Sequence, residues 1–478
     1  MAVLAGLGAV LGGVGGGAAF AVVRLVGLLS NLALLHRVGF GLPDLAHYRP
    51  GLVLVPVAVG GALVVALLAR LAPVIKGHGI PETLEAITLR ESRIPPRAAL
   101  AKPLSAAVAM GTGGPFGAEG PIIVTGGSIG SLLGQVLPVS AAERRILLAT
   151  GAAAGMAGVF GTPLAAILLA FELLLAERSL RALVPLLFST GLATALHDVL
   201  LGSHPVFALV HPAAAPTRAL GLFALLGIGA GLLAALATRG LFAFEAGFAR
   251  LPGPPFLHPL VGALGFALVG LAVPGSLSVG YWAITAAVNG RFALHAAAVL
   301  LAGKLLSWWI ALASNTSGGT LAPLFLVGAT MGEMAGIGFA HLVPAWHLQP
   351  AAFALVAMGV TFGVAARAPL TGALFALEVT GGFALVVPML VALAVAEVAG
   401  QQLLGERLMT DKLARRGHPV DLDTLDARLP VDARLQAPTL HLPRRLRRDG
   451  RGDSAGVAVT GATTGAPTAT ATTTEGRR

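Results

Sequence analysis

The sequence has no cysteine, few aromatic residues and very little charge. Asp, Glu, Lys and Arg make up 11% of its 478 residues, whereas hydrophobic residues make up 56% and the mean hydropathy is +0.84. A soluble domain carries about 25% charged residues, so this composition excludes a cytosolic enzyme and a disordered protein. It predicts a polytopic membrane protein in a lipid bilayer. Without cysteine there are no disulfides, thiolate metal sites or cysteine nucleophiles, and we expect no metal and no cofactor.

Charge is concentrated at the C-terminal end of the chain, whose net charge is +10. Residues 405–478 hold 13 of the 32 Lys and Arg residues and 9 of the 22 Asp and Glu residues. Basic clusters at 415–416 and 444–448 follow the last apolar run, and the positive-inside rule places this end in the cytoplasm. The segment has no aromatic residue to stack on a base, so we expect no nucleic-acid partner. We predict a membrane domain at 1–416 and a largely disordered cytoplasmic tail at 417–478.

Long apolar runs, separated by short polar or proline-rich pieces, fill the first 404 residues. Some are well above and some below the roughly 20 residues that cross a bilayer, and several contain glycine next to proline. We therefore expect at least ten helices, several of them tilted or broken. The first run continues past Arg24 to Leu35 without a cleavage motif, so we predict that it is a retained helix.

An internal repeat divides the apolar part into two halves, at roughly 20–200 and 215–404. Residues 163–172 match residues 369–378 at five positions, among them Glu172 and Glu378. A shift of 202 residues also places Lys102 on Lys304 and Gly117 on Gly319. Duplicated halves with broken helices are typical of transporters whose binding site lies at the repeat interface. These matches do not distinguish a parallel from an inverted arrangement.

Three short motifs rich in glycine and proline each precede a run that can form a helix. They are GHGIP at 77–81, GAEGP at 117–121 and GTLAP at 319–323. Glycine exposes backbone N–H groups, proline suits a first helical turn, and the helix dipole is positive at this end. Three such helix ends that converge would bind an anion without a full positive charge.

These motifs resemble those of the CLC family of chloride channels and chloride/proton exchangers, whose pattern is GSGIP, GK/REGP and GxFxP. The resemblance covers roughly residues 70–416 and extends to 151–172 and 367–380. It implies an all-α homodimer with one pore per subunit and two inverted repeats of tilted and broken helices. It also implies transport of chloride and similar small anions in a bacterial inner membrane. The segment after Gly417 lacks the apolar periodicity of the CBS domains that many members carry.

The family's pattern also implies which residues line the anion pathway. His78 stands where the family has serine, Leu321 where it has phenylalanine, and Met409 where many members have a pore-lining tyrosine. Ala118 replaces a basic residue at the pore mouth. The implied anion-binding set is Gly77, His78, Gly79, Ile80, Pro81, Gly117, Ala118, Gly120, Pro121, Gly319, Thr320, Leu321, Ala322 and Met409.

Glu119 is the residue that we expect to act as gate and proton acceptor. A carboxylate at a helix N-terminus inside an apolar span is costly unless it has a function. Exchangers of the family place an inner glutamate one position after Glu172, and here that residue is Leu173. We therefore expect passive conduction, with chloride/proton antiport through a non-standard inner relay as the alternative. Glu172 and Glu378 could be structural or could carry protons.

Two other classes of protein compete with an anion transporter. Residues 126–130 match the Gly-x-Ser-x-Gly motif of serine hydrolases, but they lie in a helical run rather than at a strand–helix turn. A cation transporter needs several buried carboxylates along one path. The apolar part offers few of them: Glu119, Glu172, Glu333, Glu378 and Glu397.

Overall fold

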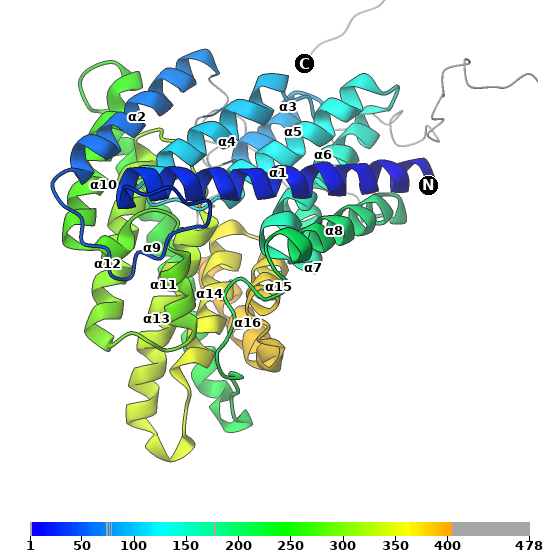
Figure 1. Cartoon of the computed structure of the whole chain (residues 1–478). Helices are drawn as coiled ribbons and strands as arrows, with labels where there is room; N and C mark the ends of the chain where they lie inside the picture. Colours follow the sequence, from blue (N-terminus) through cyan, green and yellow to red (C-terminus); the bar gives the residue numbers. More distant parts are fainter. Residues whose placement is uncertain (1, 73–74, 76, 78, 176–177, 404–478) are drawn as a thin grey trace, which may run out of the picture. The chain divides into compact units, whose positions relative to one another are not determined.

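Sixteen α-helices make up most of the part of the chain that the computed structural model describes, which is residues 2–72, 75, 77, 79–175 and 178–403 (Figure 1). This part contains no β-strand, and the prediction of an all-α protein is confirmed. The first eight helices are α1 (Ala2–Leu35), α2 (Leu54–Leu71), α3 (Ile80–Leu89), α4 (Pro96–Gly111), α5 (Glu119–Val136), α6 (Ala141–Phe160), α7 (Pro163–Leu169) and α8 (Leu180–Leu200). The other eight are α9 (Leu220–Ala249), α10 (His258–Ala272), α11 (Tyr281–Val288), α12 (Leu294–Ala313), α13 (Leu321–Leu342), α14 (Pro350–Ala366), α15 (Pro369–Thr380) and α16 (Val386–Leu403).

The order of helices in the first half recurs in the second. Helices α5 and α13 begin 202 residues apart, at Glu119 and Leu321, and α7 and α15 begin 206 residues apart, at Pro163 and Pro369. These are the shifts at which the sequence matches itself. The internal repeat is therefore a repeat of structure, with α1–α8 corresponding to α9–α16.

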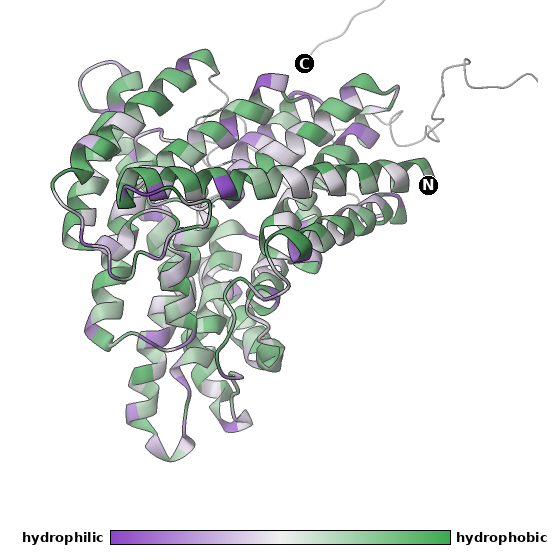
Figure 2. Cartoon of the chain, viewed as in Figure 1, coloured by the Kyte–Doolittle hydropathy of each residue, from purple (hydrophilic) through white to green (hydrophobic). Residues whose placement is uncertain are grey.

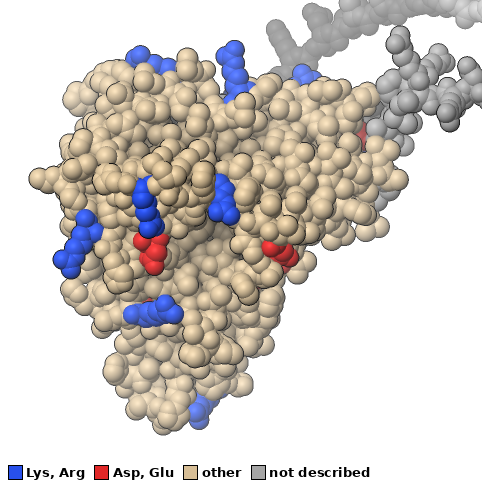
Figure 3. Space-filling view, viewed as in Figure 1, with Lys and Arg blue, Asp and Glu red and all other residues tan. Residues whose placement is uncertain are grey.

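Eight helices in the described part are long and apolar enough to cross a membrane. Helices α3, α7 and α11 have 10, 7 and 8 residues, too few for the roughly 20 that a span needs. Most residues of the helices are hydrophobic (Figure 2), and the face drawn in Figure 3 carries few charged groups. Long and short helices together give the mixture of spanning and broken segments that the uneven apolar runs predicted.

Glycines let α5 and α6 pack at very close range. A Cβ atom added at Gly126 would overlap the carbonyl oxygen of Gly151, and one at Gly130 would overlap that of Leu147. Ser128 lies between these glycines in mid-helix and is fully buried. The Gly-x-Ser-x-Gly match is thus a helix-packing motif, not the strained strand–helix turn of a hydrolase.

We predict that Gly126→Ala lowers the stability of the folded protein by about 1–3 kcal/mol, because the added methyl group forces α5 away from α6. Thermal denaturation in detergent measures the loss. Gly127→Ala is the matched control on the same helix, since a Cβ there would lie 3.6 Å or more from its neighbours. Equal melting temperatures for the two variants would contradict this account of the packing.

Candidate functional site

The first turns of α3, α5 and α13 meet inside the fold. Gly117 and Gly319, which precede α5 and α13, exchange two backbone hydrogen bonds, with N···O distances of 3.1 and 2.9 Å. Gly77, before α3, forms a second isolated bridge with Ser317. Gly79 has φ +104°, and a Cβ there would lie 2.5 Å from the carbonyl oxygen of Gly120. The three motifs therefore converge, as the transporter interpretation requires.

The same contacts restrict which N–H groups face the site. The N–H groups of Gly117 and Gly319 are used in their mutual bridge, and that of Gly79 donates to Oε2 of Glu82 at 2.7 Å. The prolines of the three motifs, at 81, 121 and 323, have no N–H. The N–H groups of the residues that begin the helices have no acceptor within the helix. Those of Glu119 and Ala322 lie at the Glu119 carboxylate, and those of Ile80, Gly120 and Leu321 have no acceptor among the described residues.

Glu119 is the first residue of α5 and is 1% exposed. Its Oε1 accepts a hydrogen bond of 3.1 Å from the hydroxyl of Tyr281, at the start of α11. Its Oε2 lies against Gly117 and Gly319: a Cβ at the first would overlap this oxygen, and one at the second would lie 2.9 Å from it. The backbone of Ala322 also lies beside the carboxylate, but Oε2 has no well-formed hydrogen bond among the described residues. The carboxylate thus lies between the first turns of α5 and α13.

Two fully buried lysines hold the loops around this carboxylate. Lys102 Nζ donates to the carbonyl oxygens of Ile75 and Gly77, at 2.7 and 2.6 Å. Lys304, its repeat counterpart, donates to those of residues 276 and 278, at 3.1 and 3.0 Å. Each lysine fixes the segment that leads into a short helix, α3 or α11, and Lys304 is close enough to Glu119 to interact with its charge. The sequence interpretation used both lysines as repeat matches only, although their position in apolar runs was itself a signal.

Glu172 and Glu378 each cap the N-terminus of a helix in the other half of the repeat. Glu378 accepts hydrogen bonds from the N–H groups of residues 164 and 165 at the start of α7 (3.1 and 2.8 Å). Glu172 accepts from Leu370 N–H, Thr371 N–H and the Thr371 hydroxyl at the start of α15, at 3.1, 2.8 and 2.6 Å. Both oxygens of each carboxylate are occupied, which favours a structural role. The next residue, Leu173, is a buried apolar side chain.

Two residues of the predicted pathway, His78 and Met409, lie outside the described residues. The others are all described, and the flanking residues Ala118, Thr320, Leu321 and Ala322 are each 3% exposed or less.

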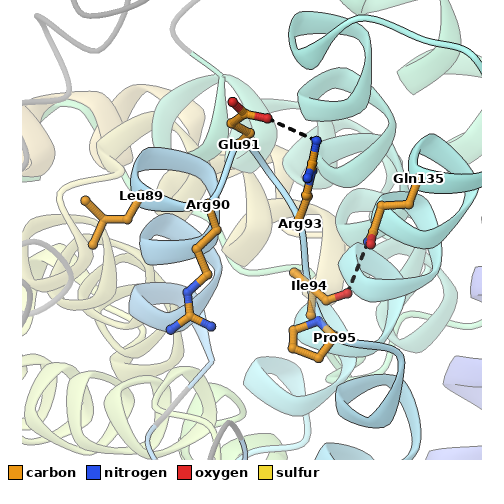
Figure 4. Close-up of a pocket in the computed structure, with 7 residues that line it drawn as sticks. All are labelled: Leu89, Arg90, Glu91, Arg93, Ile94, Pro95 and Gln135. Atoms are coloured by element: carbon orange, nitrogen blue, oxygen red, sulfur yellow. Dashed lines mark hydrogen bonds and ion pairs between the residues drawn. The ribbon is translucent and has the colours of Figure 1, made fainter.

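A pocket of about 560 Å³ lies away from this convergence, between the end of α3, the loop to α4 and the end of α5 (Figure 4). Its charged groups include Arg93, which is 3.3 Å from Glu91, and Gln135 donates to the carbonyl oxygen of Ile94. None of the three motifs lines the pocket.

Comparisons with known proteins agree with one another. The model of a family described as voltage gated chloride channel matches residues 60–401. The H(+)/Cl(-) exchange transporter ClcA of Cronobacter sakazakii is 32% identical over 376 residues, which are 73% of this chain and 79% of the relative. ClcA of Yersinia pestis bv. Antiqua is 28% identical over 64% of this chain and 66% of its own.

Solved structures share the fold. The crystal structure of a slow cyanobacterial Cl⁻/H⁺ antiporter has a TM-score of 0.74 and 28% identity, and the match covers 87% of this chain and 97% of that one. A CLC-type fluoride/proton antiporter has a TM-score of 0.70 over 85% of this chain and 97% of its own, but its 20% identity supports the fold alone. The prediction of two inverted repeats of tilted and broken helices is confirmed.

We predict that Glu378→Gln lowers stability by about 1 kcal/mol, because one amide group cannot accept both N–H groups at the start of α7. Thermal denaturation of the purified protein measures this. Asp198→Asn, which removes a carboxylate from an exposed position on α8, should leave the melting temperature unchanged. Unchanged stability in both variants would contradict the capping role.

Proposed function

The chain belongs to the voltage-gated chloride channel family, and on that premise we propose that it exchanges chloride for protons across the membrane. It is a membrane transport protein and not an enzyme. The missing inner glutamate favoured passive conduction when only the sequence was considered. The relatives and the solved structure quoted above are named exchangers or antiporters, and they favour the alternative.

The position of the Glu119 carboxylate carries the proposal. It lies between the first turns of α5 and α13, beside the backbone N–H groups of Glu119 and Ala322. An ionised carboxylate and a chloride ion compete for the same partial positive charge. When Glu119 takes up a proton, it loses this attraction and leaves the site, and chloride takes its place. When it gives up the proton, it returns and displaces the chloride.

The inner proton route does not pass through the residue pair at 172–173. Glu172 is held by three donors at the start of α15, and Leu173 has no titratable group. We therefore propose that protons reach Glu119 without a carboxylate carrier at these positions. His78 remains a predicted participant in this proton route.

The distribution of carboxylates argues against a cation pathway. Glu172 and Glu378 cap helices, and Oε1 of the fully buried Glu333 accepts the N–H of Phe292 at 2.7 Å, in the loop before α12. These side chains satisfy backbone donors of separate helices and loops, so they do not offer a cation a continuous row of ligands. The family's homodimer and a cytoplasmic C-terminus remain part of this proposal.

We predict that a chloride gradient across proteoliposomes drives protons in the opposite direction at a fixed ratio. Chloride release and external pH, recorded together with the membrane potential clamped by valinomycin, measure both fluxes. A proton flux that stays at the level of empty vesicles while chloride moves would restore the passive interpretation. A cation flux would overturn both.

We predict that Glu119→Gln lowers proton transport by at least about tenfold, because the amide cannot accept and release the proton. The same variant should pass chloride at a rate that no longer depends on pH. Glu172→Gln is the matched control, since it removes a carboxylate that caps a helix, and it should keep the proton-to-chloride ratio. A folded Glu119→Gln protein with wild-type pH dependence would contradict the gate.

A further inference from the structure

We propose that Tyr281 is a positioning residue that holds Glu119 in the closed position. Its hydroxyl donates a hydrogen bond of 3.1 Å to Oε1, whereas Gly117 and Gly319 make their closest approach to Oε2. Among the described residues, no other side chain forms a hydrogen bond with Glu119. The inference rests on the proposed role of Glu119 as gate, and the experiment below separates the two.

The direction of the Tyr281 side chain is fixed by its surroundings. Gly280 ends the preceding loop with φ +76°, and Lys304 holds that loop through the carbonyl oxygens of residues 276 and 278. The tyrosine ring packs edge-on against Phe207, with centroids 5.2 Å apart, and lies 6.0 Å from the ring of Phe160. These contacts restrain the ring, so its hydroxyl is held beside Oε1 of Glu119.

The charged groups near the carboxylate do not replace this hydrogen bond. Lys304 from α12 interacts with the charge of Glu119, but its Nζ donates its hydrogen bonds to the carbonyl oxygens of residues 276 and 278. Glu82 on α3 accepts the N–H of Gly79, and Lys102 on α4 donates to the loop before α3. The first turn of α13 presents backbone and apolar side chains. Among these titratable side chains, Tyr281 is therefore the one that hydrogen-bonds to Glu119, and its hydroxyl stabilises the ionised carboxylate more than the protonated one.

The direction in which Tyr281 shifts the protonation of Glu119 follows from the hydroxyl being the hydrogen-bond donor. A hydroxyl that donates to an ionised carboxylate favours the ionised form. Glu119 then stays ionised, and the site stays closed, to lower pH than it would without Tyr281. The hydrogen bond thus sets the pH at which transport begins and slows each exit of the gate.

The test is Tyr281→Phe in proteoliposomes, which removes the hydroxyl and keeps the ring. Chloride flux should rise at neutral pH, and the pH of half-maximal flux should move upward by about half to one unit. Tyr48→Phe, which alters the chain's other tyrosine, is the matched control and should change neither. In the Glu119→Gln background, Tyr281→Phe should have no further effect on the pH profile.

Replacement of tyrosine by 3-fluorotyrosine in the Tyr48→Phe protein supplies a stronger donor at Tyr281 alone, and it should move the profile to lower pH. A folded Tyr281→Phe protein whose flux has the wild-type pH profile would overturn the role of Tyr281 while leaving the gate in place. Equal shifts of the pH profile in Tyr281→Phe and Tyr48→Phe would do the same. If Glu119→Gln itself keeps the wild-type pH profile, the proposed gate fails instead. Should Tyr281→Phe not fold, the fluorotyrosine measurement decides alone.

Discussion

The site depends on one constraint, the close approach of three helix ends that only glycine permits. Gly117 and Gly319 exchange backbone hydrogen bonds, and Gly79 contacts Gly120 at a distance that leaves no room for a Cβ atom. Any larger residue at these positions would separate the helix ends or displace the Glu119 carboxylate. The approach brings partial positive charges together in the buried interior of the fold, where they favour an anion. In the proposed mechanism this place takes either the protein's own carboxylate or a small ion.

Two buried lysines and two partly buried glutamates fix the frame around that place. Lys102 and Lys304 bind the carbonyl oxygens of the loops before α3 and α11, and Glu172 and Glu378 bind N–H groups at the starts of α15 and α7. Each pair is related by the repeat. The lysines make equivalent contacts within each half, and the glutamates make equivalent contacts between the halves. Each of these four charged groups is held in position by at least two hydrogen bonds. Glu119 differs from these four, because its Oε2 lacks a well-formed partner among the described residues, as Oε2 of Glu333 also does.

The sequence was sufficient for the helical fold and for the three helix starts that converge, because both follow from local patterns. Apolar runs indicate helices, and the motifs indicate where three of them begin. It was not sufficient for the partners of those helix ends: that the N–H groups of Gly117 and Gly319 bind each other depends on tertiary contact. Tyr281 lies outside all three motifs and 162 residues from Glu119, so no spacing rule could pair them. The expectation of passive conduction relied on Leu173 alone, and exchanger relatives outweigh it.

An exchanger without an inner carboxylate at 173 is consistent with this geometry, because the proposed coupling arises at one place. In that proposal, chloride and the ionised form of Glu119 exclude each other from the same backbone donors, so binding of a proton and binding of chloride favour one another. That mutual effect is a property of the site and does not depend on how the proton arrives. The inner route sets how fast protons are supplied, and hence how fast the cycle turns. The ratio of the two ions depends on whether Glu119 leaves the site only when it is protonated, which makes the contacts that hold its ionised form the determinants of tight exchange.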